Sequence, residues 1–246
     1  MLESRSQILF NSFNKLLRLD LNTSVSFNLI DSHTRNIQAI AADPDENFFF
    51  TTAIDHTLKK WSTDSWKLVG SGFLESFGTS LLVKPDTQSI LVGLGNGSLS
   101  ELSLTHLSAI RTISLHDNQI TKIILLSSGE LMTCSLDGHI KFPLIADTQL
   151  KISEKGIHSI TQLSDKSIAC SCVDGLKIIP FHSDYSFISK LNLLSSNIKS
   201  ISRSSTKVPQ IISLLQNHSI QTFSMLKYQS INICSPSLSL LHNLYN

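Results

Sequence analysis

A tight-turn dipeptide that returns about every 41 residues constrains the fold of this 246-residue chain more than any other feature. Each copy lies between two short apolar segments, and Asn or Asp followed by Gly tolerates the backbone of a tight hairpin. The copies are Asn14-Lys, Asp55-His, Asn96-Gly, Asp137-Gly, Asp174-Gly and Asn217-His, at intervals of 41, 41, 41, 37 and 43 residues. Six units of this length account for the whole sequence, which therefore predicts six copies of one structural unit.

Each unit contains four short β-type segments separated by turn residues. In one unit they are residues 37–40, 47–53, 57–61 and 66–69. Such segments are read as strands, and no long helical periodicity interrupts them. A repeated unit of four strands is typical of a β-propeller, because a single four-stranded sheet cannot bury its faces alone. The sequence predicts an all-β fold: a six-bladed β-propeller of four-stranded antiparallel blades, forming one domain over residues 1–246.

One unit carries a recognisable motif. Ser32-His33, followed by Asp55-His-Thr-Leu-Lys-Lys-Trp61, resembles the GH…D-x-T-x-x-x-W-D pattern of WD40 repeats. The unit around Asp137 matches in part, and the next one keeps only its Asp. In the WD40 family a His, a Ser or Thr, an Asp and a Trp form a hydrogen-bond network that locks each blade. The resemblance implies structural roles for His33, Asp55, Trp61, His116, Ser135, Asp137 and Asp174.

No unit shows all four residues of this network. Ala53 stands where the motif of residues 32–70 would have Ser or Thr, and Pro143 and Pro180 hold the Trp position in two later units. Proline cannot donate a ladder hydrogen bond, so we expect a bulge or a strand end at both prolines. Trp61 is expected to pack between blades. Trp66 is either a half-exposed edge residue or an anchor for a partner.

The two ends of the sequence complete one unit. Residues 6–30 contain three predicted strands and lack a first one, and residues 237–245 could supply it. Propellers of the WD40 family usually close by joining both termini in one blade. The resemblance therefore implies that the last blade is closed by the N- and C-terminal segments. An edge left open would need a strand from a partner.

Composition excludes several classes of protein. Hydrophobic residues make up 41% of the chain and charged residues 16%, the reverse of a disordered chain. The net charge of +1 gives no electrostatic footprint for nucleic acid. The sequence has no signal-peptide run and no membrane-spanning run, so no membrane insertion and a cytoplasmic or nuclear location are expected. Cys170 and Cys172 share one strand face, either as packed thiols or as a redox or metal pair.

Signals for catalysis are weak. The segment Gly93-Leu-Gly-Asn-Gly-Ser98 resembles a phosphate loop, but it lacks the third glycine and runs into a predicted strand. The nine histidines are scattered along the chain. No catalytic residue, cofactor site or metal ligand is predicted. An enzymatic or small-ligand propeller with its site at the central channel remains the alternative.

A partner-binding surface is the remaining expectation. In WD40-like propellers partners usually dock on the face where the innermost strands begin. By resemblance, this face contains Asn36, Gln38, Thr79, Gln119, Thr121, His158 and Lys199. Ile54, Leu136 and Val173, which precede the turns, would add apolar contact. A neutral, partly apolar face suits a protein or peptide partner. The sequence thus predicts a non-enzymatic protein–protein interaction scaffold or adaptor subunit of a larger complex.

Overall fold

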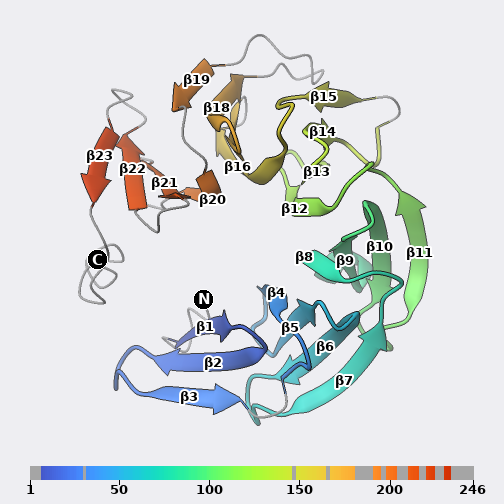
Figure 1. The fold of residues 1–246 in the computed structure, drawn as a ribbon. Coiled ribbons are helices and arrows are strands. Elements are labelled where there is room, and N and C mark those ends of the chain that lie inside the picture. Colours follow the sequence, from blue (N-terminus) through green and yellow to red (C-terminus); the bar gives the residue numbers. More distant parts are fainter. Residues whose placement is uncertain are drawn as a thin grey trace. The chain divides into compact units, whose positions relative to one another are not determined.

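The computed structural model describes the backbone of residues 7–29, 32–145, 148–164, 167–180, 191–194, 198–203, 210–215, 220–224 and 230–233. These residues form 23 strands in six antiparallel sheets, with one short 3-10 helix at Pro85–Thr87 (Figure 1). In every sheet, strands that are consecutive in the chain are neighbours. The predicted all-β class, with several four-stranded antiparallel sheets, is confirmed.

The first of two compact units covers Met1–Ile123. It begins with a three-stranded sheet of β1 (Gln7–Ser12), β2 (Lys15–Asp20) and β3 (Ser26–Leu29). The next sheet contains β4 (Ile37–Ala42), β5 (Phe48–Ala53), β6 (Thr57–Ser62) and β7 (Leu68–Phe73). The third contains β8 (Gly78–Lys84), β9 (Ser89–Leu94), β10 (Ser98–Ser103) and β11 (Ala109–Ser114).

The second unit covers Ile124–Asn246, and its first strand begins just before this boundary. Its first sheet contains β12 (Ile120–Leu125), β13 (Leu131–Ser135), β14 (His139–Lys141) and β15 (Gln149–Lys151). The next contains β16 (Ile157–Ser164), β17 (Ser167–Cys172), β18 (Gly175–Pro180) and β19 (Leu191–Leu194). The last contains β20 (Ile198–Arg203), β21 (Gln210–Leu215), β22 (Ile220–Ser224) and β23 (Ser230–Ile233).

The recurring dipeptides form the hairpin turns that the sequence predicted. Four of them place their residue of positive φ one position after the Asx residue: His56, Gly97, Gly138 and Gly175. In three of these turns the Asx side chain accepts the backbone N–H two residues later: Asp55 from Thr57 at 3.1 Å, Asn96 from Ser98 at 3.1 Å and Asp137 from His139 at 2.8 Å. This bond holds the hairpin whether the side chain is charged or neutral. Asn217 lies outside the described residues.

A second repeated turn, which was not identified from the sequence, joins the last two strands of the first three sheets. Its first residue caps the turn by accepting two backbone N–H groups, and its fifth has positive φ. The first and fifth residues are Asp20 and Ser24, Ser62 and Trp66, and Ser103 and Leu107. Leu107 is buried against β7, where its carbonyl oxygen lies 2.2 Å from the position that a Cβ on Gly72 would take. Only glycine fits this contact between consecutive sheets.

Trp61 packs within the first unit, between its first two sheets. It is buried together with Leu16 of β2 and Phe49 of β5. The Trp61 and Phe49 rings are nearly parallel, with centroids 6.0 Å apart. Trp66 is half-buried: its ring is 5.9 Å from that of Phe49, and the Arg18 guanidinium lies 4.3 Å above it. Both tryptophans thus contribute to packing between consecutive sheets.

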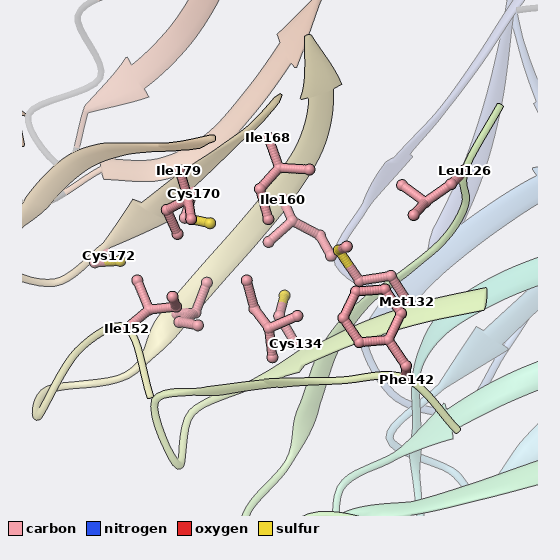
Figure 2. Packing of buried hydrophobic residues seen from close by; sticks show 12 residues of the cluster. Leu126, Met132, Cys134, Phe142, Ile152, Ile160, Ile168, Cys170, Cys172 and Ile179 are labelled. Atoms are coloured by element: carbon pink, nitrogen blue, oxygen red, sulfur yellow. The ribbon is translucent and has the colours of Figure 1, made fainter. Parts of the chain in front are cut away.

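The core of the second unit is an aliphatic cluster that includes three cysteines. Cys134, Cys170 and Cys172 are fully buried, and none of the three forms a disulfide. Figure 2 shows Cys170 and Cys172 beside Ile152, Ile160 and other side chains of this cluster. The arrangement agrees with the interpretation of Cys170 and Cys172 as packed thiols. Cys234 lies outside the described residues.

Candidate interaction surface

A hydrogen-bond network joins the loop before β4, strand β5, the β5–β6 turn and strand β6. Trp61 Nε1 donates to Thr51 Oγ1 at 2.9 Å, and Thr51 Oγ1 lies 2.7 Å from His33 Nε2. His33 Nδ1 lies 2.9 Å from an Asp55 carboxylate oxygen. Trp Nε1 is only a donor and a carboxylate only an acceptor, so a neutral His33 with its proton on Nδ1 satisfies every group. Thr51 then donates its hydroxyl proton to His33 Nε2.

Burial and hydrogen bonding set the protonation of this network. Burial lowers the pKa of His33 and outweighs the opposing effect of the Asp55 charge. Burial would raise the pKa of Asp55. Hydrogen bonds from the Thr57 hydroxyl, the Thr34 N–H and His33 prevail and hold it at about 2. Near neutral pH the pair is therefore an imidazole and a carboxylate whose bonding capacity is used within the fold, an arrangement that stabilises structure.

Thr51 supplies the hydroxyl of this network, so the expectation that Ala53 holds that position was wrong. Alternate residues of a strand share one face, so Thr51 and Ala53, two positions apart, lie on the same face of β5. Ala53 instead packs in the cluster of Trp61 and Leu16. Residues 32–62 thus contain all four residues of the motif: His33, Thr51, Asp55 and Trp61.

The sheet of β12–β15 has a partial version. His116 is buried, Ser135 Oγ accepts the backbone N–H of Asp137 at 3.0 Å, and Thr133 holds the position of Thr51. Thr133 Oγ1 donates to the Lys141 carbonyl at 3.3 Å. Strand β14 ends at Lys141, two residues before Pro143, and β18 ends at Pro180. Both prolines thus mark the strand ends expected of them.

The sheet of β16–β19 surrounds its turn aspartate with different groups. Ser153 Oγ donates to Asp174 Oδ1 at 2.9 Å, and Lys177 Nζ donates to Asp174 Oδ2 at 2.7 Å. Lys177 is only 7% exposed, and it also donates to the Ile152 carbonyl at 2.9 Å. Burial would raise the pKa of Asp174, but Lys177 and Ser153 lower it overall. No sequence pattern indicated this ion pair between the buried Lys177 and the half-buried Asp174.

Four of the positions expected to bind a partner are extra residues in β-bulges. The ladder between the first and second strands slips by one residue in four sheets, and the unpaired residue is Gln38, Thr79, His158 or Lys199. Bulges re-aim side chains and are often found beside binding sites. Each of the four therefore has the same place in its own sheet.

The exposure of the expected residues differs between positions. Asn36 and Gln38 are exposed, Gln119, Thr121 and His158 are half-buried, and the Lys199 side chain lies outside the described residues. Thr79 is buried, and its hydroxyl bonds the Gly93 carbonyl at 2.8 Å and also the Ile120 carbonyl. Its hydroxyl is therefore occupied within the fold. Ile54, Leu136 and Val173 are half-buried at their turns.

Phe77 shares this surface in the first unit and was missed from sequence. It lies 41 residues after Asn36, and its carbonyl accepts the Gly95 N–H at 2.9 Å, as that of Asn36 accepts the Ile54 N–H at 3.0 Å. Its ring meets the exposed His56 ring edge-on, with centroids 6.3 Å apart. The 41-residue period alone could have identified Phe77.

The segment resembling a phosphate loop is occupied by packing. It forms the β9–β10 hairpin, and the space beside Gly93 and Gly95 is filled by Ile120 and the Phe77 ring. In the part of the chain that the structure describes, no three His, Cys, Asp or Glu side chains are grouped to hold a metal ion. Nor do the described residues include a helix of the length and apolarity that a membrane span requires.

Comparisons with known proteins agree with this geometry. Residues 24–62 match the family model of the WD domain, G-beta repeat (WD40). The fold is similar to that of a chain in the structure titled "Crystal Structure of Mitotic Checkpoint Complex", with a TM-score of 0.78 and 9% sequence identity. That likeness covers 92% of this chain and 73% of the other. The sequence matches no curated protein.

The fold and the network are both similar to those of one repeat family. Repeated antiparallel sheets, a turn aspartate in each of several hairpins and one complete His–Thr–Asp–Trp network are the features of WD40 repeats. The family model covers the residues that form that network. The resemblance to the WD40-repeat β-propeller family is thereby confirmed.

Proposed function

We propose that this protein is a non-enzymatic scaffold or adaptor subunit of a larger protein complex. The carrying observation is the WD40 repeat at residues 24–62 with its complete internal network. A chain of similar fold occurs in a structure titled as a complex. The groups of this network bond one another, which supports a structural rather than a chemical role.

The proposed contact surface lies where the first strands begin. In the first unit it includes the exposed Asn36 and Gln38, with half-buried Ile54 and Phe77 beside them. Thr79 holds the equivalent bulge of the next sheet, while Gln119 and Thr121 flank the start of β12. In the second unit His158 and Lys199 occupy bulges of their own sheets. Amides and apolar side chains without a dominant charge suit a protein or peptide, and no nucleic-acid partner is proposed.

We also propose that residues 1–246 form one six-bladed propeller closed by its two terminal segments. The sheet of β1–β3 has one strand fewer than the others, and β1 is half-buried or exposed where β5 and β9 are buried. Three to seven residues separate the last strand of one sheet from the first strand of the next. Three residues separate Ile233 from residue 237, which is within the range of the connections between consecutive sheets. Residues 237–245 would therefore reach the open edge of the β1–β3 sheet.

Closure is tested by thermal unfolding. A chain ending at residue 236 is compared with the full chain and with the double variant Leu238→Asp/Leu240→Asp. Closure predicts a clear loss of melting temperature in both, because a fourth strand would cover β1. Unchanged melting in both would contradict closure.

The interaction role is tested by affinity purification from the native cell, with mass spectrometry of the recovered proteins. A stoichiometric partner is expected, and the surface variant Asn36→Arg/Gln38→Arg should release it. Lys67→Glu, an exposed position directly before strand β7, is the matched control. Recovery of a partnerless protein carrying a metal or small ligand would instead support a ligand-binding propeller.

We propose a cytoplasmic or nuclear location, because the buried Cys134, Cys170 and Cys172 form no disulfide. Reduced cysteines are typical of these compartments. Fluorescence of the tagged protein in its native cell tests this, and a secretory or organellar signal would contradict it.

A further inference from the structure

The β1–β2 turn holds an exposed aromatic side chain in a strained backbone conformation. Phe13 has a φ of 54° and is 74% exposed. The corresponding turns of four other sheets place their positive φ on His56, Gly97, Gly138 and Gly175. Positive φ is disfavoured for a bulky residue and clusters at functional sites, and the other bulky residues that share it here, Trp66 and Leu107, are packed within the fold. Packing does not explain it, because most of the Phe13 ring is outside the core.

Three hydrogen bonds fix this turn against the segment that leads into β4. The Phe13 carbonyl accepts the Ile37 N–H at 2.8 Å, and Asn11 Nδ2 donates to the Ile37 carbonyl at 3.0 Å. Asn14 Nδ2 donates to the His33 carbonyl at 3.2 Å. The backbone of Phe13 is therefore held beside residues 33–37, at the edge of the surface that contains Asn36.

Two exposed cations lie beside this turn, one next to it in the sequence and one in the segment that is hydrogen-bonded to it. Lys15 follows it directly, and Arg35 lies in the segment pinned to it. Neither has a hydrogen-bond or ion-pair partner among the residues that the structure describes. The carboxylate that contacts the same segment, Asp55, is already bonded by His33, Thr34 and Thr57. The turn thus combines an aromatic ring with positive charge that this carboxylate does not neutralise.

We propose that Phe13, Lys15 and Arg35, here named the Phe13 corner, bind an acidic peptide segment of a protein partner. Carboxylates of the segment pair with Lys15 and Arg35, and one of its apolar side chains packs on Phe13. Charge-assisted bonds to arginine and lysine favour carboxylates, and an exposed aromatic beside them supplies an apolar anchor. This inference rests on the proposed interaction role and names the chemistry of one contact.

Binding of labelled synthetic peptides, followed by fluorescence anisotropy, tests the Phe13 corner. The probe is Gly-Ser-Glu-Glu-Phe-Glu-Glu-Ser-Gly, and its counterparts replace all Glu by Lys or the Phe by Ser. The acidic, Phe-containing probe is expected to bind best and to weaken with added salt. Arg35→Glu and Phe13→Gly should each weaken it about tenfold or more, and Lys67→Glu should not. No binding of the acidic probe, or equal binding by all variants, would overturn the proposal.

Phe13→Gly separates a binding role from a structural one. Glycine accepts positive φ without strain, so this variant should melt no lower than the native chain. A lower melting temperature together with unchanged peptide binding would show that Phe13 serves the fold. If partners recovered from the native cell remain bound to Phe13→Gly and Arg35→Glu, the Phe13 corner fails while the scaffold role stands. If no partner is recovered at all, the scaffold role fails, and the peptide result judges the corner on its own.

Discussion

The sheets β4–β7 and β16–β19 hold the same turn aspartate by different chemistry. Around Asp55 the partners are a neutral imidazole, two hydroxyls and a tryptophan N–H relayed through Thr51. Around Asp174 they are a serine hydroxyl and a buried lysine ammonium. The first network joins several elements without burying a cation, whereas the second depends on one ion pair. Both sheets thus keep the turn carboxylate, while the groups that donate hydrogen bonds to it differ.

The largest effect is expected from Trp61→Ala in the first sheet of this pair. It removes a fully buried ring and the N–H bonded to Thr51, which should cost about 3 to 5 kcal/mol of unfolding free energy. Chemical denaturation measures it. Trp66→Ala, at a half-buried ring, is the control and should cost much less. Equal losses would show that Trp61 has no special place in the network.

Asp174→Ala should cost about 3 kcal/mol or more, because it leaves the Lys177 ammonium buried without its carboxylate. The double variant Asp174→Ala/Lys177→Met should recover most of this loss, since it removes the stranded charge. Denaturation of the three proteins gives the coupling energy. A double variant as unstable as Asp174→Ala would contradict the ion-pair account.

The corresponding substitution in the other sheet sharpens the contrast. Asp55→Ala leaves the Thr34 N–H and the His33 Nδ1–H without their acceptor. We expect a loss of about 2 to 3 kcal/mol. Adding Thr57→Val should not rescue it, because no buried cation is left behind. Rescue by this second change would show that the two networks work alike.

Gly72→Ala should cost about 1 to 3 kcal/mol, because its Cβ would lie 2.2 Å from the Leu107 carbonyl oxygen. Gly129→Ala is an informative control: it has free space around its Cβ position but a φ of 94°. Its loss reflects backbone strain alone. Thermal unfolding compares the two, and a Gly72→Ala protein as stable as the native chain would contradict the packing of Leu107 on β7.

The smallest expected effect is a slope of stability against pH just below pH 6.5, which the Asp55 network has because it contains His33. The folded-state pKa of His33 is lowered by burial below its usual value of 6.5, so protonation favours the unfolded chain. Stability should fall as pH drops from above 6.5 toward the folded-state pKa. Asp55 adds a second loss between its usual pKa of 3.8 and its folded pKa of about 2. The melting temperature of the native chain should fall more steeply with falling pH just below pH 6.5 than that of His33→Asn. Equal slopes of melting temperature against pH would contradict this.

Local turn chemistry made much of the fold predictable. Asx-Gly pairs prescribe hairpins by themselves, so the turn period located the two paired strands on either side of each described turn. Motif spacing identified His33, Asp55 and Trp61 in the same way. Thr51 was missed because Thr51 and Ala53 lie on the same face of the strand, and the spacing of the motif was counted to Ala53.

Contacts set by non-local pairing could not be predicted. Lys177 reaches Asp174 and the Ile152 carbonyl because β18 runs beside the segment before β16, which no local pattern encodes. Phe13 was missed for another reason: Asn14 is the expected residue for positive φ, and the turn places it on Phe13 instead. The candidate surface was predictable only where the 41-residue period or the family motif applied.

Native mass spectrometry of the protein purified at its natural abundance tests the scaffold role most directly. The account predicts one copy of the 27.2 kDa chain in a heavier assembly of fixed stoichiometry, with that assembly lost in Asn36→Arg/Gln38→Arg and kept in Lys67→Glu. A 27.2 kDa monomer as the sole species for the native chain would contradict it.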